Sequence, residues 1–181
     1  SATALVKGMK LRECIGNRPV LMCASTRNGE EARILDVLEQ LDRNALLLLV
    51  PRHPQRFDDV AGMIRNRNIP MIRRSTLHDL SANALSPDTR ILLGDSMGEM
   101  FMYYAACDIA FIGGSLEKFG GQNLIEACAV GKPVLIGPHT FNFEAITKDA
   151  IAAHAAIRIT SARELMQRAN ELLSDQTLHQ T

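Results

Sequence analysis

Short apolar runs alternate along the chain with longer stretches in which apolar residues recur at helical spacing. In residues 30–41, for example, Ile34, Leu35 and Leu38 fall on one face of a helix. This pattern predicts strands at residues 20–24, 45–50, 71–72, 90–93, 109–112, 133–136 and 156–159. It predicts helices at residues 30–41, 55–66, 97–107, 122–130 and 143–153, and a last helix that Ser161 caps and that runs to Leu173.

Six or seven strands that alternate with helices predict a parallel sheet covered on both faces. The strands are almost purely apolar, which is typical of strands buried on both sides. The predicted fold class is therefore α/β, a Rossmann-like doubly wound parallel sheet. Residues 75–88 are polar and turn-rich and predict a surface loop, whereas residues 1–17 are weakly patterned. We expect residues 1–17 to be a linker or the remnant of a longer chain, and residues 18–181 to form one domain.

The composition narrows the function classes. The chain has 181 residues, of which 46% are hydrophobic, and its 20 basic and 20 acidic side chains balance. The apolar content excludes a disordered chain, and the balanced charge argues against a protein that binds nucleic acid through its phosphates. The longest aliphatic run, residues 45–50, is far shorter than the roughly 20 residues of a membrane span. We also expect no signal peptide at the N-terminus.

The four cysteines show neither a CxxC pair nor a histidine at zinc-ligand spacing. They are Cys14, Cys23, Cys107 and Cys128. Three of them lie in apolar segments, so we interpret them as reduced core residues in a cytoplasmic setting. The glutamates and histidines also lack metal-binding spacing, and we expect neither a metal nor a cofactor.

Polar residues and glycines follow several strands, at the edge where a parallel sheet binds its ligands. The most specific segment is Gly120-Gly121-Gln122-Asn123-Leu124-Ile125-Glu126. Two glycines let a backbone approach a phosphate, and we expect them to open a helix whose N-terminal amides favour an anion. Asn123 and Glu126 are three residues apart and would share a helix face, where a carboxylate can accept hydrogen bonds from both ribose hydroxyls. The structural alternative is a plain loop with a helix cap.

Three other segments are weaker candidates for the same edge. Arg52 and His53 follow a strand and could pair with a phosphate or carboxylate, although a surface turn between two prolines is also possible. Ser25 and Thr26 offer hydroxyls near a helix start, where a simple N-cap is equally expected. The last segment contains Gly94, Asp95, Gly98 and Glu99, which could form only a tight turn and a cap.

Several common catalytic motifs are missing from the sequence. The chain has no G-x-S-x-G elbow, no G-x-x-x-x-G-K-[ST] loop and no G-x-G-x-x-G after its first strand. Interpretation as a hydrolase, an NTPase or a dinucleotide dehydrogenase is weakened accordingly.

Taken in order, the motifs of this chain resemble the C-terminal half of the 3-deoxy-D-manno-octulosonic acid (Kdo) transferases. The motifs that carry the resemblance are Ala24-Ser-Thr-Arg-Asn-Gly-Glu-Glu31, Val50-Pro-Arg-His-Pro54, Gly94-Asp95 with Gly98-Glu99, Gly113-Gly-Ser-Leu116, Gly120-Gly-Gln-Asn123 with Glu126-Ala127, and residues 131–143. The resemblance covers residue 18 to the C-terminus, and its specificity lies in the combination.

The resemblance implies a GT-B glycosyltransferase, in which two Rossmann-like domains face each other across a cleft. Residues 18–181 would be the nucleotide-sugar domain that binds the donor, CMP-Kdo. The absent N-terminal domain would hold the lipid A precursor, the membrane-association surface and the catalytic carboxylate. The family transfers Kdo without a metal at the cytoplasmic face of the bacterial inner membrane, in lipopolysaccharide biosynthesis. We therefore expect this piece to be soluble, to contain no catalytic residue, to bind nucleotide weakly and to transfer nothing alone.

The resemblance also suggests a role for each candidate residue. Asn123 and Glu126 would hold the CMP ribose and phosphate, beside a phosphate loop formed by Gly120 and Gly121. Arg52 and His53 would lie near the charged groups of the donor, and Ser25 and Thr26 in the first loop of the cleft. The loop near the base would contain Gly94, Asp95, Gly98 and Glu99. The segment Glu117-Lys118-Phe119 departs from the small and proline-rich residues of the family pattern.

Two alternatives remain at this point. A UDP-sugar transferase of the same architecture would use the same glycine pair and Glu126, and the preferred nucleobase would distinguish it. A binding or scaffold domain would use Arg52 and the loop at 75–88 for a protein partner, and it would have no affinity for nucleotides.

Overall fold

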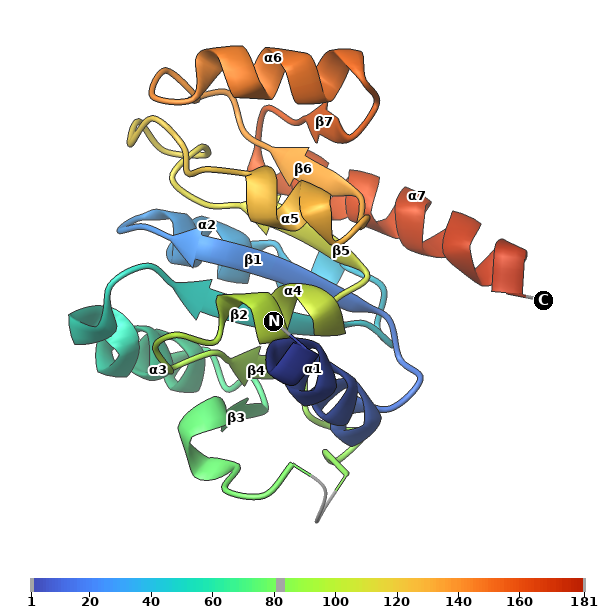
Figure 1. Ribbon diagram of the computed structural model, residues 1–181. Helices are drawn as coiled ribbons and strands as arrows, with labels where there is room; N and C mark the ends of the chain where they lie inside the picture. Colours follow the sequence, from blue (N-terminus) through green and yellow to red (C-terminus); the bar gives the residue numbers. More distant parts are fainter. Residues whose placement is uncertain (1, 81–83, 181) are drawn as a thin grey trace.

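A single sheet of seven parallel strands forms the centre of the molecule in the computed structural model (Figure 1). The structure describes residues 2–80 and 84–180, and it describes side chains as far as Asp175. The strands are β1 (Val20–Thr26), β2 (Leu46–Pro51), β3 (Met71–Arg73), β4 (Ile91–Leu93), β5 (Ile109–Ile112), β6 (Val134–Ile136) and β7 (Ala156–Arg158). Their order in the sheet is β3-β4-β2-β1-β5-β6-β7, and every neighbouring pair is parallel. The predicted doubly wound parallel sheet is confirmed.

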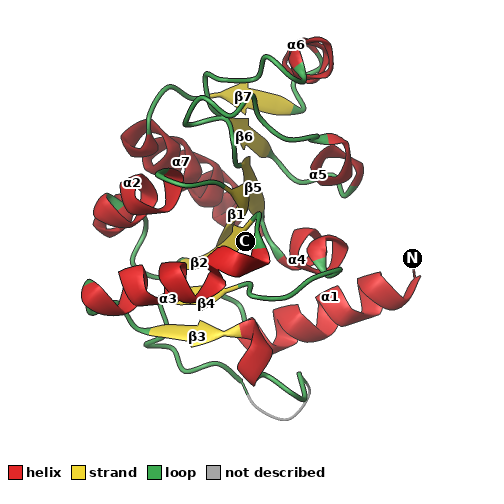
Figure 2. Ribbon diagram, turned by 90° about the vertical axis from the view of Figure 1, so that its left-hand side faces the viewer, coloured by secondary structure: helices red, strands yellow, loops and turns green. Residues whose placement is uncertain are grey.

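Helices cover both faces of this sheet, as the view along its edge in Figure 2 shows. They are α1 (Ala2–Ile15), α2 (Glu30–Asp36), α3 (Phe57–Asn66), α4 (Met100–Ala106), α5 (Ile125–Ala129), α6 (Glu144–Ala152) and α7 (Ala162–Gln180). Helices α2, α3 and α7 lie on one face, and α1, α4 and α5 on the other. Three short 3-10 turns complete the elements: η1 (Leu38–Gln40), η2 (Pro54–Arg56) and η3 (Arg74–Thr76). Among the described residues, no helix has the length and apolarity needed to cross a bilayer.

Alternation of side chains along the strands divides the core into two layers. In β2, Leu47 and Leu49 pack with α2, α3 and α7, whereas Leu46 and Leu48 pack with α1 and α4. All six residues of β2 are buried. A strand that is apolar on both sides therefore specifies a central position in the sheet, and β2 lies between β4 and β1.

Helix α1 lies where the sequence pattern predicts no element. Residues 2–15 form a helix that packs on α4, with Gly8, Leu11 and Cys14 buried. A Cβ at Gly8 would meet the Ala105 side chain, so the two helices touch at a glycine. The expectation of a linker does not describe these residues. Their apolar periodicity is weak because only one narrow stripe of α1 contacts the domain.

Several predicted helices are too long, and local contacts explain where they end. The helix predicted at 30–41 ends at Asp36, and η1 follows it. The guanidinium of Arg90 donates to the carbonyl oxygens of Leu38 and Leu41, both at 2.9 Å, and so stabilises that turn. The helix predicted at 97–107 begins only at Met100, after Gly98 with φ +73°.

The predicted capping box at the start of α7 is only half formed. The backbone N–H of Glu164 donates to the Ser161 hydroxyl at 3.1 Å, but the Glu164 carboxylate accepts from Thr160. The cysteines are free thiols, as predicted, with three of them buried and Cys128 half-buried. Burial raises the pKa of the Cys107 thiol to about 12.

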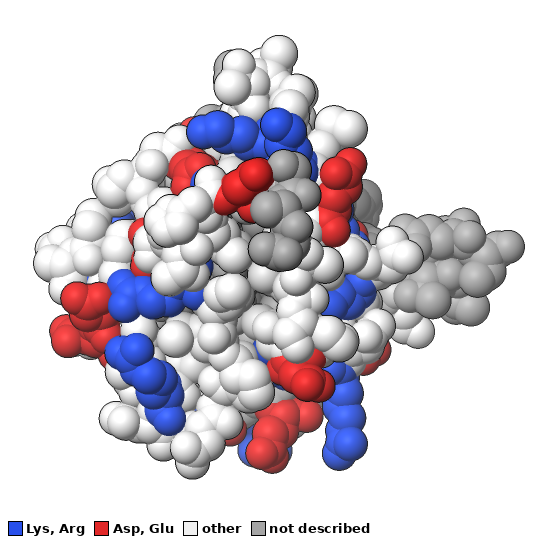
Figure 3. All heavy atoms as spheres, turned by 90° about the horizontal axis from the view of Figure 1, so that it is seen from below, with Lys and Arg blue, Asp and Glu red and all other residues white. Residues whose placement is uncertain are grey.

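The loop predicted at 75–88 is polar and irregular after η3, and residues 81–83 lie outside the described part. Figure 3 shows the molecule from below, where basic and acidic side chains lie among one another instead of in separate fields. This mixture agrees with the formal net charge of zero.

Candidate functional site

The chain reverses its direction of travel across the sheet between β1 and β5. From β1 it proceeds to β2, whereas β5 lies on the other side of β1 and leads to β6. Loops that follow such neighbouring strands diverge and leave a crevice beyond their carboxyl ends, which is the usual ligand site of this fold. The loops that meet there are residues 25–29 (the first loop), 113–123 (the glycine loop) and 137–143 (the β6 loop).

The first loop begins with a backbone irregularity at Ser25. The pairing register of β1 with β2 shifts between Ala24 and Thr26, and Ser25 adopts φ +56°. A non-glycine residue in this conformation is strained, and such strain is concentrated at functional sites. Gly113 approaches this bulge closely, because its N–H donates to the Ala24 carbonyl at 2.6 Å. A Cβ at Gly113 would collide with the carbonyl oxygens of Ala24 and Ser25, so only glycine fits there.

Glu30 ties the first loop to the glycine loop. Its side chain is fully buried, and its carboxylate accepts four backbone N–H groups. The donors and distances are Arg27 (2.8 Å), Gly114 (2.7 Å), Leu116 (2.9 Å) and Glu117 (3.3 Å). Burial raises the pKa of Glu30, and the four N–H donors act in the opposite direction.

The glycine loop is also joined to itself and to the β6 loop. The N–H of Gly121 donates to the Gly114 carbonyl at 2.8 Å, and the N–H of Asn142 donates to the Gly120 carbonyl at 3.1 Å. Gly120 has φ +88°, and a Cβ there would collide with the side chains of Asn142 and Phe141. The predicted phosphate-loop glycines therefore lie at a junction of loops, and at Gly120 a side chain would not fit.

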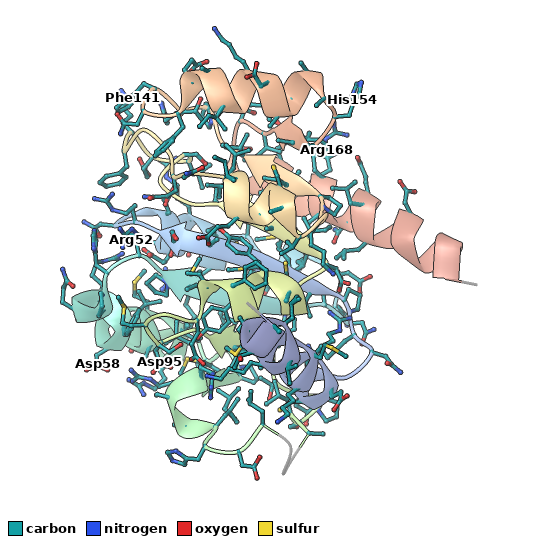
Figure 4. The ribbon with its side chains drawn as sticks, in the orientation of Figure 1. Arg52, Asp58, Asp95, Phe141, His154 and Arg168 are labelled. Atoms are coloured by element: carbon teal, nitrogen blue, oxygen red, sulfur yellow. The ribbon has the colours of Figure 1, made fainter. Side chains whose placement is uncertain are left out.

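Basic residues flank this junction at the ends of β1 and β2. The Arg52 N–H donates to the Thr26 carbonyl at 2.9 Å, which places Arg52 next to the first loop. The Arg27 guanidinium stacks on the Phe119 ring, 4.4 Å from its centre. Figure 4 shows Arg52 and Phe141 at the edge to which β1 points, with His154 and Arg168 at the opposite edge.

The electrostatic effect of this cluster appears at His53. Partial burial lowers the pKa of His53, and the positive charges of Arg27, Arg52 and Arg56 lower it further. Arg56 itself is paired, because the buried Glu31 carboxylate accepts two hydrogen bonds from its guanidinium, both at 2.9 Å. Among the described residues, Arg27 and Arg52 form no ion pair, so these two cations of the group are available to an anion at this edge.

The segment with Asn123 and Glu126 differs from the helix that we expected. Helix α5 begins at Ile125, not at Gln122, and has only five residues. The Asn123 side chain lies before it and accepts the Ile125 N–H at 3.0 Å, so the two residues do not share a helix face. The prediction that the glycine pair opens a helix is wrong, because Gly120 and Gly121 both adopt positive φ. Glu126 is exposed in the first turn of α5, and its ribose role stays a prediction.

The segment after β4 forms a separate network two strands away from β1. The Asp95 carboxylate is almost fully buried and accepts from Arg73 (2.7 Å) and from the N–H and hydroxyl of Ser75 (2.8 and 2.6 Å). Arg73 also binds Asp58 at 2.8 Å, and the two carboxylates lie on the same side of the molecule in Figure 4. Glu99 pairs with Arg74 at 3.1 Å.

The glycines of this segment also have structural reasons. A Cβ at Gly94 would meet Val50 and Tyr103, and Gly98 adopts φ +73°. Because Arg73 and Ser75 donate to it, the carboxylate of Asp95 already has its hydrogen-bond partners within the protein. A role of this segment near the nucleobase of the donor stays a prediction.

The structure brings together Ser25, Thr26, Arg52, His53, Gly120 and Gly121. The Thr26 hydroxyl is buried without a hydrogen-bond partner among the described residues. Sequence reasoning missed Arg27, Glu30 and Phe119 as site residues. A signal was available for Glu30, because an acidic residue directly after Gly29 at a helix start is placed to bind backbone N–H groups.

Comparison with known proteins gives the family. Residues 33–181 match the family described as "Glycosyl transferases group 1". The chain belongs to this family. It is 46% identical over 164 residues to a 3-deoxy-D-manno-octulosonic acid transferase of Bordetella pertussis, and 43% identical over 161 residues to one of Haemophilus influenzae. These matches cover 87% of this chain and 37% and 36% of the relatives, so the chain spans little more than a third of their length.

A solved structure supports the same relationship within the family. The C-terminal CMP-Kdo binding domain of WaaA from Acinetobacter baumannii superposes with a TM-score of 0.88 at 31% identity, covering 97% of this chain and 91% of that one. The resemblance to the C-terminal domain of the Kdo transferases and the GT-B assignment of the fold are therefore confirmed.

Proposed function

We propose that this chain binds CMP-Kdo as the donor domain of a glycosyltransferase that moves Kdo to a lipid A precursor in lipopolysaccharide biosynthesis. The observation that carries the proposal is the cationic junction at the carboxyl ends of β1 and β2. A Kdo nucleotide carries a phosphate and a carboxylate, and Arg27 and Arg52 lie where two anionic groups of one ligand could reach both. The similarity to a CMP-Kdo binding domain supports this choice of donor.

In the proposed reaction an acceptor hydroxyl attacks the anomeric carbon of Kdo, and CMP leaves with its phosphate. The negative charge that builds on that phosphate would be stabilised by Arg52 and Arg27 from preorganised positions. Glu126 would hold the ribose hydroxyls from the first turn of α5. The general base and the acceptor site would come from a longer enzyme, and the relatives are more than twice the length of this chain. We place this enzyme at the cytoplasmic face of the inner membrane, where the lipid acceptor is available.

Calorimetric titration of this chain with CMP, and with UMP and AMP as controls, tests which nucleotide the donor site prefers. We expect CMP to bind, weakly but in preference to UMP and AMP. Preference for UMP would instead indicate a UDP-sugar transferase, and no binding to any of the three would contradict a donor site within this chain. A radiolabel assay should detect no Kdo transfer by the chain alone.

A pair of variants tests the ribose role of Glu126. Glu126→Ala should weaken CMP binding at least about tenfold, the size of one lost hydrogen bond to a charged group, without changing the melting temperature. Glu171→Ala is the matched control, since Glu171 is an exposed helical glutamate that pairs with Arg168, and Figure 4 shows Arg168 at the opposite edge of the molecule. An unchanged dissociation constant for CMP in Glu126→Ala would refute the ribose role.

A further inference from the structure

The buried carboxylate of Glu30 contacts both the first loop and the glycine loop. Its Oε1 accepts the N–H groups of Arg27 and Gly114, and its Oε2 accepts those of Leu116 and Glu117. These residues lie on loops that follow β1 and β5 and that are more than 80 positions apart in the chain. The carboxylate thus holds two backbones in a fixed relative position.

The contacts continue from Glu30 to the groups that would meet a ligand. Arg27, whose N–H is held by Glu30, places its guanidinium on the Phe119 ring of the other loop. Gly114, also held by Glu30, accepts the N–H of Gly121 through its carbonyl. Each of these residues therefore lies one or two contacts away from the Glu30 carboxylate.

Chemistry limits what could replace this group. Four N–H donors converge on two oxygens, so the site needs an acceptor with about four lone pairs and no donor of its own, which describes an ionised carboxylate. An amide would turn an NH2 group toward two of the four donors. The two loops would then separate or leave buried N–H groups unsatisfied.

We propose that Glu30 is the positioning residue of the donor site: its carboxylate sets Arg27 and the glycine loop at the separation that a sugar nucleotide requires. Glu30 itself is fully buried, so it would act through the loops and not by touching the donor. This inference rests on the proposed function, because the ligand that it names is the donor. It differs from that function in predicting that a residue outside the contact surface governs affinity.

The test compares Glu30→Gln with Asp108→Asn in this chain. Asp108 is a matched control, since its carboxylate also accepts a backbone N–H, from Val20 at 2.8 Å, and pairs with Arg12. It lies at the start of β5, at the opposite end of the strand from the glycine loop. CMP affinity is measured by calorimetry, thermal stability by melting, and the amide resonances of Gly114, Leu116 and Glu117 by NMR.

We expect Glu30→Gln to weaken CMP affinity about tenfold or more and to move these three amide resonances, because they lose a charged acceptor. Asp108→Asn should lower the melting temperature while leaving CMP affinity and these resonances near those of the wild type. Wild-type affinity in a folded Glu30→Gln variant would overturn the inference. So would an equal loss of affinity in both variants, which would reflect general destabilisation.

A measurement on the wild type covers the case in which Glu30→Gln does not fold. CMP added to the wild-type chain should shift the amide resonances of Arg27, Gly114 and Leu116, and unshifted resonances in a CMP-bound sample would overturn the inference. A wild type that binds no CMP would instead contradict the proposed function, so the two failures are distinguishable.

Discussion

The ion pair between Glu31 and Arg56 offers a quantitative test of how the edge of the site is held. Glu31 lies on α2 with its side chain 0% exposed, and Arg56 lies on η2 with its side chain 19% exposed. Both carboxylate oxygens accept from the guanidinium at 2.9 Å, which makes the contact bidentate. The hydrogen bonds to Glu31 raise the pKa of Arg56, so the guanidinium stays charged at any working pH.

Removing Glu31 leaves that charge with only partial access to water. Breaking a buried pair by deleting one partner costs about 3–5 kcal/mol. Because Arg56 is partly exposed and can turn toward solvent, we expect Glu31→Ala to lower the free energy of unfolding by about 3 kcal/mol, at the lower end of that range. For a domain of this size that loss corresponds to a decrease in melting temperature of roughly 6–12 °C.

Urea denaturation of five proteins measures the pair directly: the wild type, Glu31→Ala, Glu31→Leu, Arg56→Met and the double variant of Glu31→Leu with Arg56→Met. The double variant has no charge to bury, so its free energy of unfolding should fall by less than that of Glu31→Leu alone. We expect a coupling energy of about 2 kcal/mol between the two positions. A loss below about 1 kcal/mol in Glu31→Ala, or two single losses that simply add in the double variant, would refute the argument from burial.

Two further predictions concern glycines and a histidine. Gly120→Ala should lower the free energy of unfolding by about 1–3 kcal/mol, because Gly120 has φ +88° and a Cβ would meet Asn142. Gly62→Ala in α3 has open space around the new methyl group and should raise the free energy of unfolding by about 0.5–1 kcal/mol. Urea denaturation that shows the same sign for both variants would contradict this contrast. His53 should titrate below its ordinary pKa in NMR spectra, and CMP should raise that pKa by offsetting the charge of Arg27 and its neighbours. Because the folded pKa is the lower one, the contribution of His53 to stability is present above the unfolded pKa of about 6.5 and is lost as the pH falls through the folded value. A His53 pKa that CMP leaves unchanged would place the ligand elsewhere.

The sequence by itself determined the class of fold and the edge that carries the candidate site. The run Leu46–Val50 is apolar at every position, and a strand of that kind is stable only with helices on both faces. Once the strands are parallel, the residues that follow them must lie at one edge, which is why Ser25, Arg52 and Gly120 could be assigned to the same region. Local glycine and polar signals were sufficient for this assignment, because topology alone brings such residues together.

Only the tertiary structure decided how those residues are held. No pattern near Glu30 indicates that its carboxylate accepts the N–H groups of Gly114 and Leu116, because hydrogen bonds between residues far apart in the chain leave no periodic trace in the sequence. The start of α5 was misplaced for a similar reason: contacts across the loop hold Gly120 and Gly121 at positive φ, which a right-handed helix does not allow. Helix α1 went unseen because a narrow contact with α4 buries only a few of its side chains. Local propensity acts over a few residues, whereas the site depends on contacts that form only when the sheet has assembled.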